Sequence, residues 1–144
     1  MTAMAGAPPA GAAVLRAAIT YFALVFGAGF ILGPIRVLLL EPRVGTRMAE
    51  LMETPLLLVV IVLAARWLHR ARTSAMTHAQ RLQVGALTVG CVLLADIGVG
   101  MGLRGMSLAA VFLERDPVSG TAYYLLLALT ALMPWWLGRR ATRA

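Results

Sequence analysis

Apolar residues gather into long runs that are separated by short polar segments. Three runs are long enough by themselves to cross a membrane, at about residues 14–40, 82–103 and 121–137. A helix needs about 20 mostly apolar residues to span a hydrocarbon core of about 30 Å. The short polar turn after the first run predicts that the first two helices form an antiparallel hairpin. We therefore predict an all-α integral membrane four-helix bundle with antiparallel up-down spans.

The second span is harder to delimit than the other three. Its purely apolar part, residues 55–68, has 14 residues, which makes a helix about 21 Å long. This is too short for the membrane core, so we extend the span to residues 47–68. Pro55 then lies inside the helix. The alternative is a shorter helix capped by Thr54, with the preceding segment lying flat in the interface.

The remaining segments complete a single membrane domain. Residues 1–13 are small and proline-containing, which indicates a disordered tail. The transmembrane domain is expected over residues 14–138, followed by a basic tail at 139–144. Residues 41–46 form a polar turn, and the connection 104–120 holds a short apolar stretch at helical spacing, which predicts an interfacial helix.

Charge sets the expected orientation. Hydrophobic residues make up 60% of the chain and charged residues 13%, and the formal net charge is +7. Every basic residue is an arginine beside an apolar run, so we expect a lipid bilayer and not nucleic acid as the partner. With the amino terminus inside, eight arginines fall on the cytoplasmic side and five on the other. Both termini are therefore predicted to be cytoplasmic.

Five charged residues are predicted to form an intramembrane polar network near the outer leaflet. Arg36, Glu53 and Asp96 lie at a similar depth, one or two turns from the outer ends of their spans. Glu50 and Arg104 lie close to the same level. Charges at membrane depth usually face the bundle interior and form pairs. We expect Arg36 to pair with Glu53 or Asp96, in a layer that is neutral without a bound ion.

Two pairs of glycines at GxxxG spacing are candidate helix-packing positions. They are Gly29 with Gly33 in the first span, and Gly98 with Gly102 in the third. Small residues at this spacing let another helix approach closely. The alternative is chance, because glycine is common in membrane helices.

The motifs of known enzyme classes are absent from the sequence. It has no HExxH, CxxC or phosphate-binding loop, and no histidine lies in a predicted span. We expect no catalytic residue, metal or cofactor. The predicted function is that of a non-enzymatic accessory or partner-binding protein, attached to a larger membrane complex or to copies of itself. The alternative is a small oligomeric transporter, or a proton- or ion-conducting protein, that uses Asp96.

Several sequence blocks resemble a widespread, uncharacterised family of small four-span bacterial integral membrane proteins. The blocks are FGAGFILGPIRVL, PRVGTRMAELMETP, LLVVIVLAARWL, LRGMSL and RDPVSGTAYYLLLALTALMP. The resemblance covers about residues 22–138. It implies the four-span architecture and a location in the bacterial inner membrane, and it brings no activity, cofactor or site residue.

Overall fold

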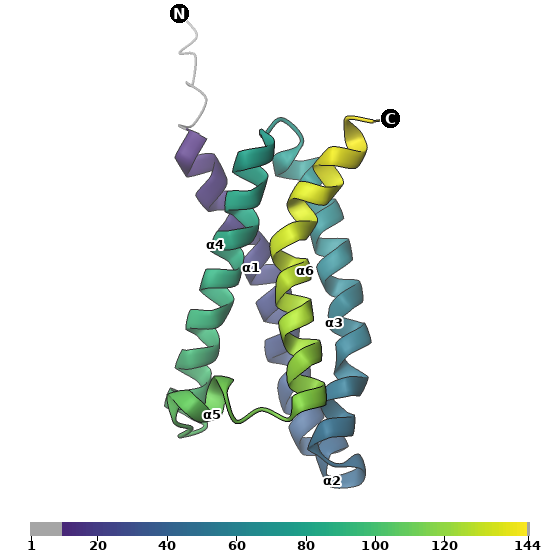
Figure 1. Cartoon of the computed structure of the whole chain (residues 1–144), viewed down its shortest axis with the longest axis vertical. Helices are drawn as coiled ribbons and strands as arrows, with labels where there is room; N and C mark the ends of the chain where they lie inside the picture. The colour runs from purple at the N-terminus through teal and green to yellow at the C-terminus, as the bar shows by residue number, and fades with distance from the viewer. Residues whose placement is uncertain (1–9, 144) are drawn as a thin grey trace, which may run out of the picture.

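The computed structural model describes residues 10–143, and every regular element in that range is helical. Four long helices make up the bundle (Figure 1). They are α1 (Ala10–Ile35), α3 (Thr46–Leu68), α4 (His78–Ile97) and α6 (Pro117–Ala141). The π-helical segments η1 (Arg36–Leu40), η2 (His69–Thr73) and η3 (Gly98–Leu103) prolong α1, α3 and α4, and α2 (Glu41–Val44) and α5 (Leu108–Phe112) are short.

The four long helices form a ring in which each packs against two others. Helix α1 contacts α3 and α4, and α6 contacts the same two helices from the opposite side. The beginning of α1 and the end of α6 lie at one end of the bundle, which we call the termini end (Figure 1). Helices α2 and α5 lie at the other end, which we call the hairpin end. The all-helical, four-helix architecture is therefore confirmed.

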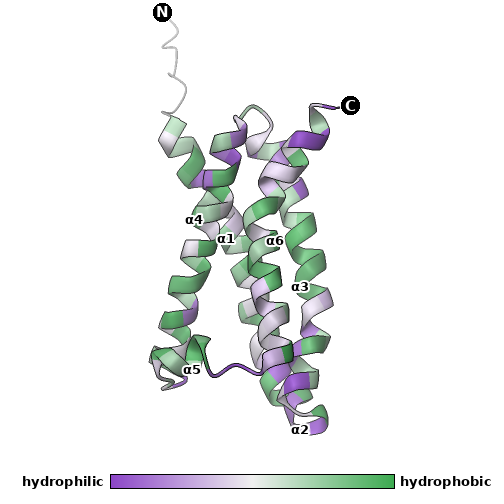
Figure 2. Ribbon diagram, in the orientation of Figure 1, coloured by the Kyte–Doolittle hydropathy of each residue, from purple (hydrophilic) through white to green (hydrophobic). Residues whose placement is uncertain are grey.

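All four helices are long and apolar enough to cross a membrane, over 35, 28, 26 and 25 residues when the prolonging segments are included. Hydrophobic residues colour the middle of the bundle, whereas hydrophilic residues are concentrated at the two ends and in the α5–α6 connection (Figure 2). A multi-pass membrane protein is the reading that these features support.

Several predicted boundaries need correction; η2 carries the second helix on to Thr73, α4 begins at His78 instead of residue 82, and α6 begins at Pro117 instead of residue 121. Residues 10–13 belong to α1 and not to a disordered tail, while residues 1–9 lie outside the described part of the chain. Residues 41–44 continue the first helical rod as α2, and residues 139–141 continue α6 instead of beginning a tail. Each of these segments extends an existing helix. Its residues, apart from prolines, have a backbone N–H that can join the hydrogen bonds of that helix.

The second span has the longer of its two predicted forms. Helix α3 begins at Thr46 and carries Pro55 in its interior. The Thr54 hydroxyl does not cap a helix but donates to the carbonyl of Glu50 at 2.9 Å, one turn earlier. Only Gly45, at φ 80°, separates α2 from α3. A glycine suits this position because side chains disfavour positive φ.

Local side chains determine where the later helices begin. Thr77 and Gln80 form a reciprocal capping box at the start of α4. At the start of α6, Asp116 Oδ1 accepts hydrogen bonds from the N–H groups of Val118 and Ser119 at 3.0 and 3.2 Å. These caps satisfy amide groups that have no partner within their own helix. The α6 cap also fixes Asp116 beside α3, which matters for the polar residues described below.

The apolar core occupies the termini half of the bundle and the middle. Its fully buried members come from all four long helices and include many small residues: Val14, Ala17, Ala18, Tyr21, Val25, Ile61, Ala64, Ala65, Leu68, Val84 and Met133. On the first helical rod, no residue after Val25 is buried, up to the end of α2. We call residues 26–44 the uncovered segment. The bundle is therefore densely packed at one end and less so at the other.

Candidate functional site

Arg36 is the centre of a group of acidic residues at the hairpin end, which we call the carboxylate cluster (Arg36, Glu41, Glu50 and Glu53). Its Nη1 atom donates to Glu53 Oε2 at 2.9 Å and lies 3.6 Å from Glu50 Oε1. Its Nε atom lies 3.4 Å from Glu41 Oε1. The predicted pairing of Arg36 with Glu53 is thus present. One guanidinium therefore faces three carboxylates.

The position of the cluster follows from the geometry of the first hairpin. Glu50 and Glu53 are three residues apart on α3, so they share one face of that helix. Arg36 begins η1, immediately after the end of α1, and Glu41 lies beside it because it follows one π-helical turn later on the same rod. Glu53 is 7% exposed. A carboxylate this buried needs a strong partner to remain charged, and Arg36 provides one.

A second polar group joins α4, α5 and α6. The Tyr123 hydroxyl donates to Asp96 Oδ2. The guanidinium of Arg115 lies over the Tyr123 ring, with its central carbon 4.0 Å from the ring centroid. Arg115 Nε donates to the carbonyl of Val111 at 2.7 Å. We call Asp96, Arg115 and Tyr123 the tyrosine cluster, because the tyrosine contacts both charged residues.

An exposed ion pair links α3 to the start of α6. Arg47 contacts Asp116 Oδ2 through Nε at 2.8 Å and through a terminal nitrogen at 2.6 Å. The hydrogen bond from Arg47 lowers the pKa of Asp116 below its ordinary value, and the backbone N–H groups of Val118 and Ser119 act in the same direction. Asp116 therefore caps one helix and ties it to another.

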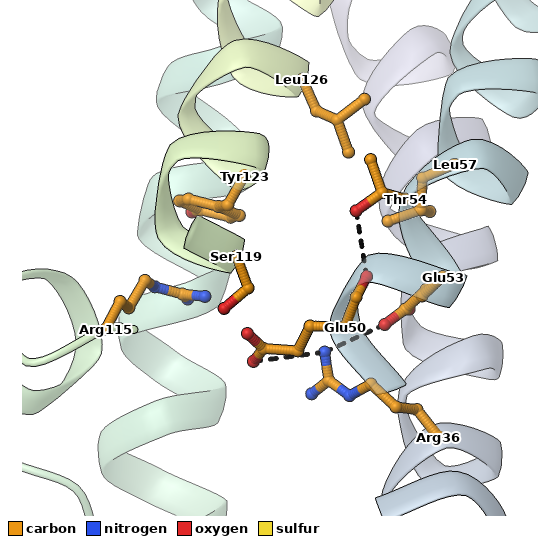
Figure 3. Close-up of a pocket in the computed structure, with 9 residues that line it drawn as sticks. All are labelled: Arg36, Glu50, Glu53, Thr54, Leu57, Arg115, Ser119, Tyr123 and Leu126. Carbon is orange, nitrogen blue, oxygen red and sulfur yellow. Dashed lines mark hydrogen bonds and ion pairs between the residues drawn. The ribbon is translucent and has the colours of Figure 1, made fainter. Parts of the chain in front are cut away.

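A small pocket of about 50 Å³ separates the carboxylate cluster from the tyrosine cluster. Figure 3 shows Arg36, Glu50 and Glu53 on one side of it and Arg115, Ser119 and Tyr123 on the other. Thr54, Leu57 and Leu126 complete the lining. A space of this volume accommodates a few water molecules or a small polar group. It is the place where the charged residues of three elements converge.

Two members of the predicted network lie elsewhere. Asp96 pairs with Tyr123, and no ion pair connects it to Arg36 within residues 10–143. Arg104 is exposed and forms no ion pair with any described residue. Arg104 is the C-terminal cap of η3, beyond which the chain continues to α5. Arg36 thus faces three acids of its own hairpin, so the expected balance of Arg36 and Arg104 against Glu53 and Asp96 is not the pairing observed, and the neutrality of the layer stays a prediction.

The predicted glycine ridges do not pack the helices of this chain together. Gly29 alone of the four has a neighbour, since a Cβ there would lie 3.8 Å from Leu57 Cδ2. At Gly33, Gly98 and Gly102 nothing lies within 4 Å of such a Cβ. The GxxxG spacing places two glycines on one face of a helix, but it does not determine whether that face turns inward.

Close helix contacts occur at other glycines. A Cβ on Gly85 would collide with the backbone carbonyl of Ala131, which shows how closely α4 approaches α6. A Cβ on Gly138 would collide with the Arg81 side chain. Sequence spacing could not single these residues out, because neither has a glycine partner four residues away.

Four contributors to the site were not predicted: Glu41, Arg115, Ser119 and Tyr123. They were not singled out because polar residues at the ends of spans are common at the membrane–water interface, whether or not they belong to a site. The position of Asp116 before Pro117 was a usable signal, because an aspartate before a helix-initiating proline predicts a cap that fixes the start of α6. That start places Ser119 and Tyr123 one turn apart on the same helix.

Comparison with known proteins adds no candidate activity. No family model, curated protein or solved structure matches this chain. Among residues 10–143, no group of three or more histidine, cysteine, aspartate or glutamate side chains could hold a metal ion. Functional inference therefore rests on the geometry of the bundle and its charges.

Proposed function

We propose that this chain is a non-enzymatic accessory protein of the bacterial inner membrane, with four spans and both termini in the cytoplasm. In this proposal it binds a larger membrane protein through the uncovered segment, residues 26–44. The carboxylate cluster holds the end of that segment against α3, so that the binding surface has a defined shape.

The uncovered segment is the observation that carries the proposal. All five buried residues of α1 lie at or before Val25, and none occurs in η1 or α2. Ile31 is 66% exposed and Leu38 72% exposed. Gly33 has open space where its side chain would be. An apolar helix with little cover and a small residue on its surface is well suited to contact another membrane helix.

Site-specific crosslinking in intact cells tests this proposal. A photoreactive residue at Ile31 or Leu38 should yield one adduct of defined mass with another membrane protein. Matched positions are Leu63 on α3 and Leu125 on α6, which are 60% and 66% exposed. These controls should crosslink only weakly and without a defined product. Equal adducts from all four positions, or no protein adduct from any, would contradict the proposal.

Transport through Asp96 is the competing function, and a flux assay separates the two. Purified protein in liposomes should show no proton or ion flux above that of empty liposomes. Flux that is present with the natural chain and lost in Asp96→Asn would replace the accessory proposal with the transport one.

Cysteine labelling tests the proposed orientation. Thr46 and Val118 are exposed at the hairpin end, and Ser74 is exposed at the termini end. In a Cys91→Ala background, single cysteines at Thr46 or Val118 should react with an impermeant thiol reagent added to spheroplasts. A cysteine at Ser74 should not react until the membrane is opened. The reverse pattern would place the termini outside.

A further inference from the structure

The acidic wall of the pocket retains unused hydrogen-bonding capacity. Arg36 Nη1 donates a hydrogen bond to Glu53 Oε2 at 2.9 Å. Its distance to Glu50 Oε1 is 3.6 Å, which is short enough for an ion pair but too long for a hydrogen bond. Glu50 accepts no side-chain hydrogen bond from any residue in the described part of the chain. Three carboxylates beside one guanidinium also leave two formal negative charges without a partner. This wall favours a hydrogen-bond donor that carries positive charge.

The opposite wall is basic and is held in place. Arg115 is fixed by its hydrogen bond to Val111 and by the Tyr123 ring, so it cannot swing toward Glu50 without losing both contacts. Its terminal nitrogens form neither an ion pair nor a hydrogen bond within residues 10–143. Figure 3 shows the guanidinium directed toward Ser119. This wall favours an anionic acceptor.

Ser119 provides an independent sign that a ligand atom belongs here. Its side chain lines the pocket and is only 4% exposed. Its Oγ atom has no hydrogen-bond partner among the described residues. The hydroxyl lies between the Arg115 guanidinium and the Glu50 carboxylate in Figure 3. Buried hydroxyl groups nearly always have a hydrogen-bond partner, so the Ser119 hydroxyl favours a polar atom in the pocket.

We propose that this pocket binds a zwitterion that carries a primary ammonium and a phosphate or carboxylate group on a short linker. The ammonium contacts Glu50, and the anionic group contacts Arg115 and Ser119. A purely anionic ligand would face the excess carboxylates, and a purely cationic one would leave Arg115 without a partner. This inference is independent of the proposed partner surface, because it rests on the opposite charges of the two walls.

The chemistry fits two sources, a phosphoethanolamine lipid headgroup or a free amino-acid-like solute. The pocket lies at the hairpin end, where the α2 turn and the α5–α6 connection are polar. The Arg36 and Glu50 side chains there are 17% and 21% exposed, so the pocket is not sealed. Leu57 and Leu126 provide apolar surface for the short linker.

Binding to the full chain in detergent tests the inference. The probes are O-phosphoethanolamine and glycine as zwitterions, with ethanolamine and inorganic phosphate as their separate halves, and the readout is calorimetry. At least one zwitterion should bind about 10-fold more tightly than either half, since two charged walls are engaged together. Phosphate binding as tightly as the zwitterions would make this an anion site and overturn the inference. Binding of none of the four, together with no preference for phosphatidylethanolamine over phosphatidylcholine in the lipid test below, would overturn it too.

Retention of lipid distinguishes the two sources. Native mass spectrometry of protein from membranes that contain phosphatidylethanolamine and phosphatidylcholine should show retained phosphatidylethanolamine if the ligand is the headgroup. A trimethylated ammonium cannot donate a hydrogen bond to Glu50, so phosphatidylcholine should be lost. No retention of phosphatidylethanolamine, together with tight binding of a soluble zwitterion, identifies a solute site. Equal retention of the two lipids, with no soluble zwitterion bound, overturns the inference.

Variants locate the binding in the pocket. Ser119→Ala should weaken binding of the preferred zwitterion about 5-fold, and Glu50→Gln and Arg115→Gln about 10-fold or more each. Glu50→Gln should also reduce the preference for the zwitterion over phosphate, an effect that general destabilisation cannot produce. Ser74→Ala and Arg104→Gln are the matched controls, because both residues are exposed and lie outside the pocket. Unchanged affinity in all three pocket variants would overturn the assignment.

Discussion

The two ends of the bundle both contain a well-shielded arginine, but they surround it differently. At the termini end, Arg81 is 4% exposed and donates to the carbonyls of Thr73 and Ser74 at 3.0 and 2.8 Å. At the hairpin end, Arg36 is surrounded by carboxylates. Carbonyl dipoles stabilise a cation without adding charge, whereas carboxylates bring charge of their own. The Arg81 site therefore carries no excess negative charge, whereas the Arg36 site keeps capacity for a further charged group.

The packing of the helices also differs between the two ends. Near the termini end, a Cβ on Gly85 would collide with the backbone of α6, whereas at the hairpin end Gly33, Gly98 and Gly102 face open space and the tight contact of Gly100 is with the Val111 side chain. Close backbone contact between α4 and α6 therefore marks the termini half of the molecule, whereas charge pairs connect helices in the hairpin half. Substitutions at the two ends should therefore have different consequences.

The largest effect is expected at the dense end. Gly85→Val should lower the free energy of unfolding by at least about 2 kcal/mol, because the added carbons collide with the Ala131 backbone. Gly90→Ala on the same helix is the control, since nothing lies within 4 Å of its Cβ position. It should leave stability unchanged or raise it by up to about 1 kcal/mol. Unfolding in mixed micelles of rising SDS content measures both, and equal losses would contradict the packing difference.

A double-mutant cycle addresses the carboxylate cluster. Arg36→Leu should cost about 3 kcal/mol, because it leaves the buried Glu53 without its partner. Combining it with Glu53→Leu should be less harmful than the sum of the two single changes, by about 1 to 3 kcal/mol. The cycle with Asp96→Leu should instead be additive to within about 0.5 kcal/mol. Coupling to Asp96 that equals the coupling to Glu53 would show that the two polar clusters act as one.

A smaller effect is expected in the tyrosine cluster. Tyr123→Phe removes the hydroxyl that donates to Asp96 and should cost about 1 kcal/mol. Tyr124→Phe is the neighbouring control, because its hydroxyl bonds the carbonyl of Phe112 at an exposed position. Its cost should be smaller, since water replaces the lost partner. A larger loss in Tyr124→Phe would contradict the role assigned to the α4–α6 bond.

The smallest effect concerns the exposed Arg47–Asp116 pair and depends on pH. The pKa of Asp116 is lowered in the folded protein, so its ionised form adds stability above the ordinary aspartate pKa of about 3.9. That contribution is lost as the pH falls through the lower folded pKa. Asp116→Asn keeps a capping side chain but not the charge. The natural chain should be slightly more stable than this variant at pH 6, and the difference should vanish at the acidic limit.

Salt gives the control for that measurement. The difference at pH 6 should shrink in 0.5 M NaCl, because exposed pairs are screened. A difference that stays constant with pH would assign the effect to the cap instead of the charge.

The sequence predicts the helices better than it predicts their contacts. Three long apolar runs and a fourth that reaches full length with its upstream residues predict four long helices whatever the packing, which is why the architecture was predictable. The pairing of Arg36 with Glu53 was also predictable, because both residues lie near one short turn and at a similar depth. Such inferences depend only on distance along the chain.

Contacts between distant helices depend on how each helix is rotated, which spacing does not determine. Asp96 was expected near Arg36 on grounds of depth, but the face of α4 that carries it turns toward Tyr123. Unknown helix rotation also explains why the two GxxxG pairs were expected at helix contacts that the structure does not have. Arg115 was missed because it acts from a connection whose path is set by the Asp116 cap. The pocket joins several of these contacts, so it could not be predicted from the residues alone.

The carboxylate cluster also bears on how the protein is made. All of its members lie between residues 36 and 53, within the first hairpin. A chain synthesised from its amino terminus can therefore form these ion pairs as soon as its second helix emerges, before the later spans exist. Asp96 has to wait for a tyrosine 27 residues further on. On the proposed four-span topology, the first hairpin would enter the bilayer with its arginine already compensated, and the third helix would enter with an acid that lacks its partner until synthesis of the fourth.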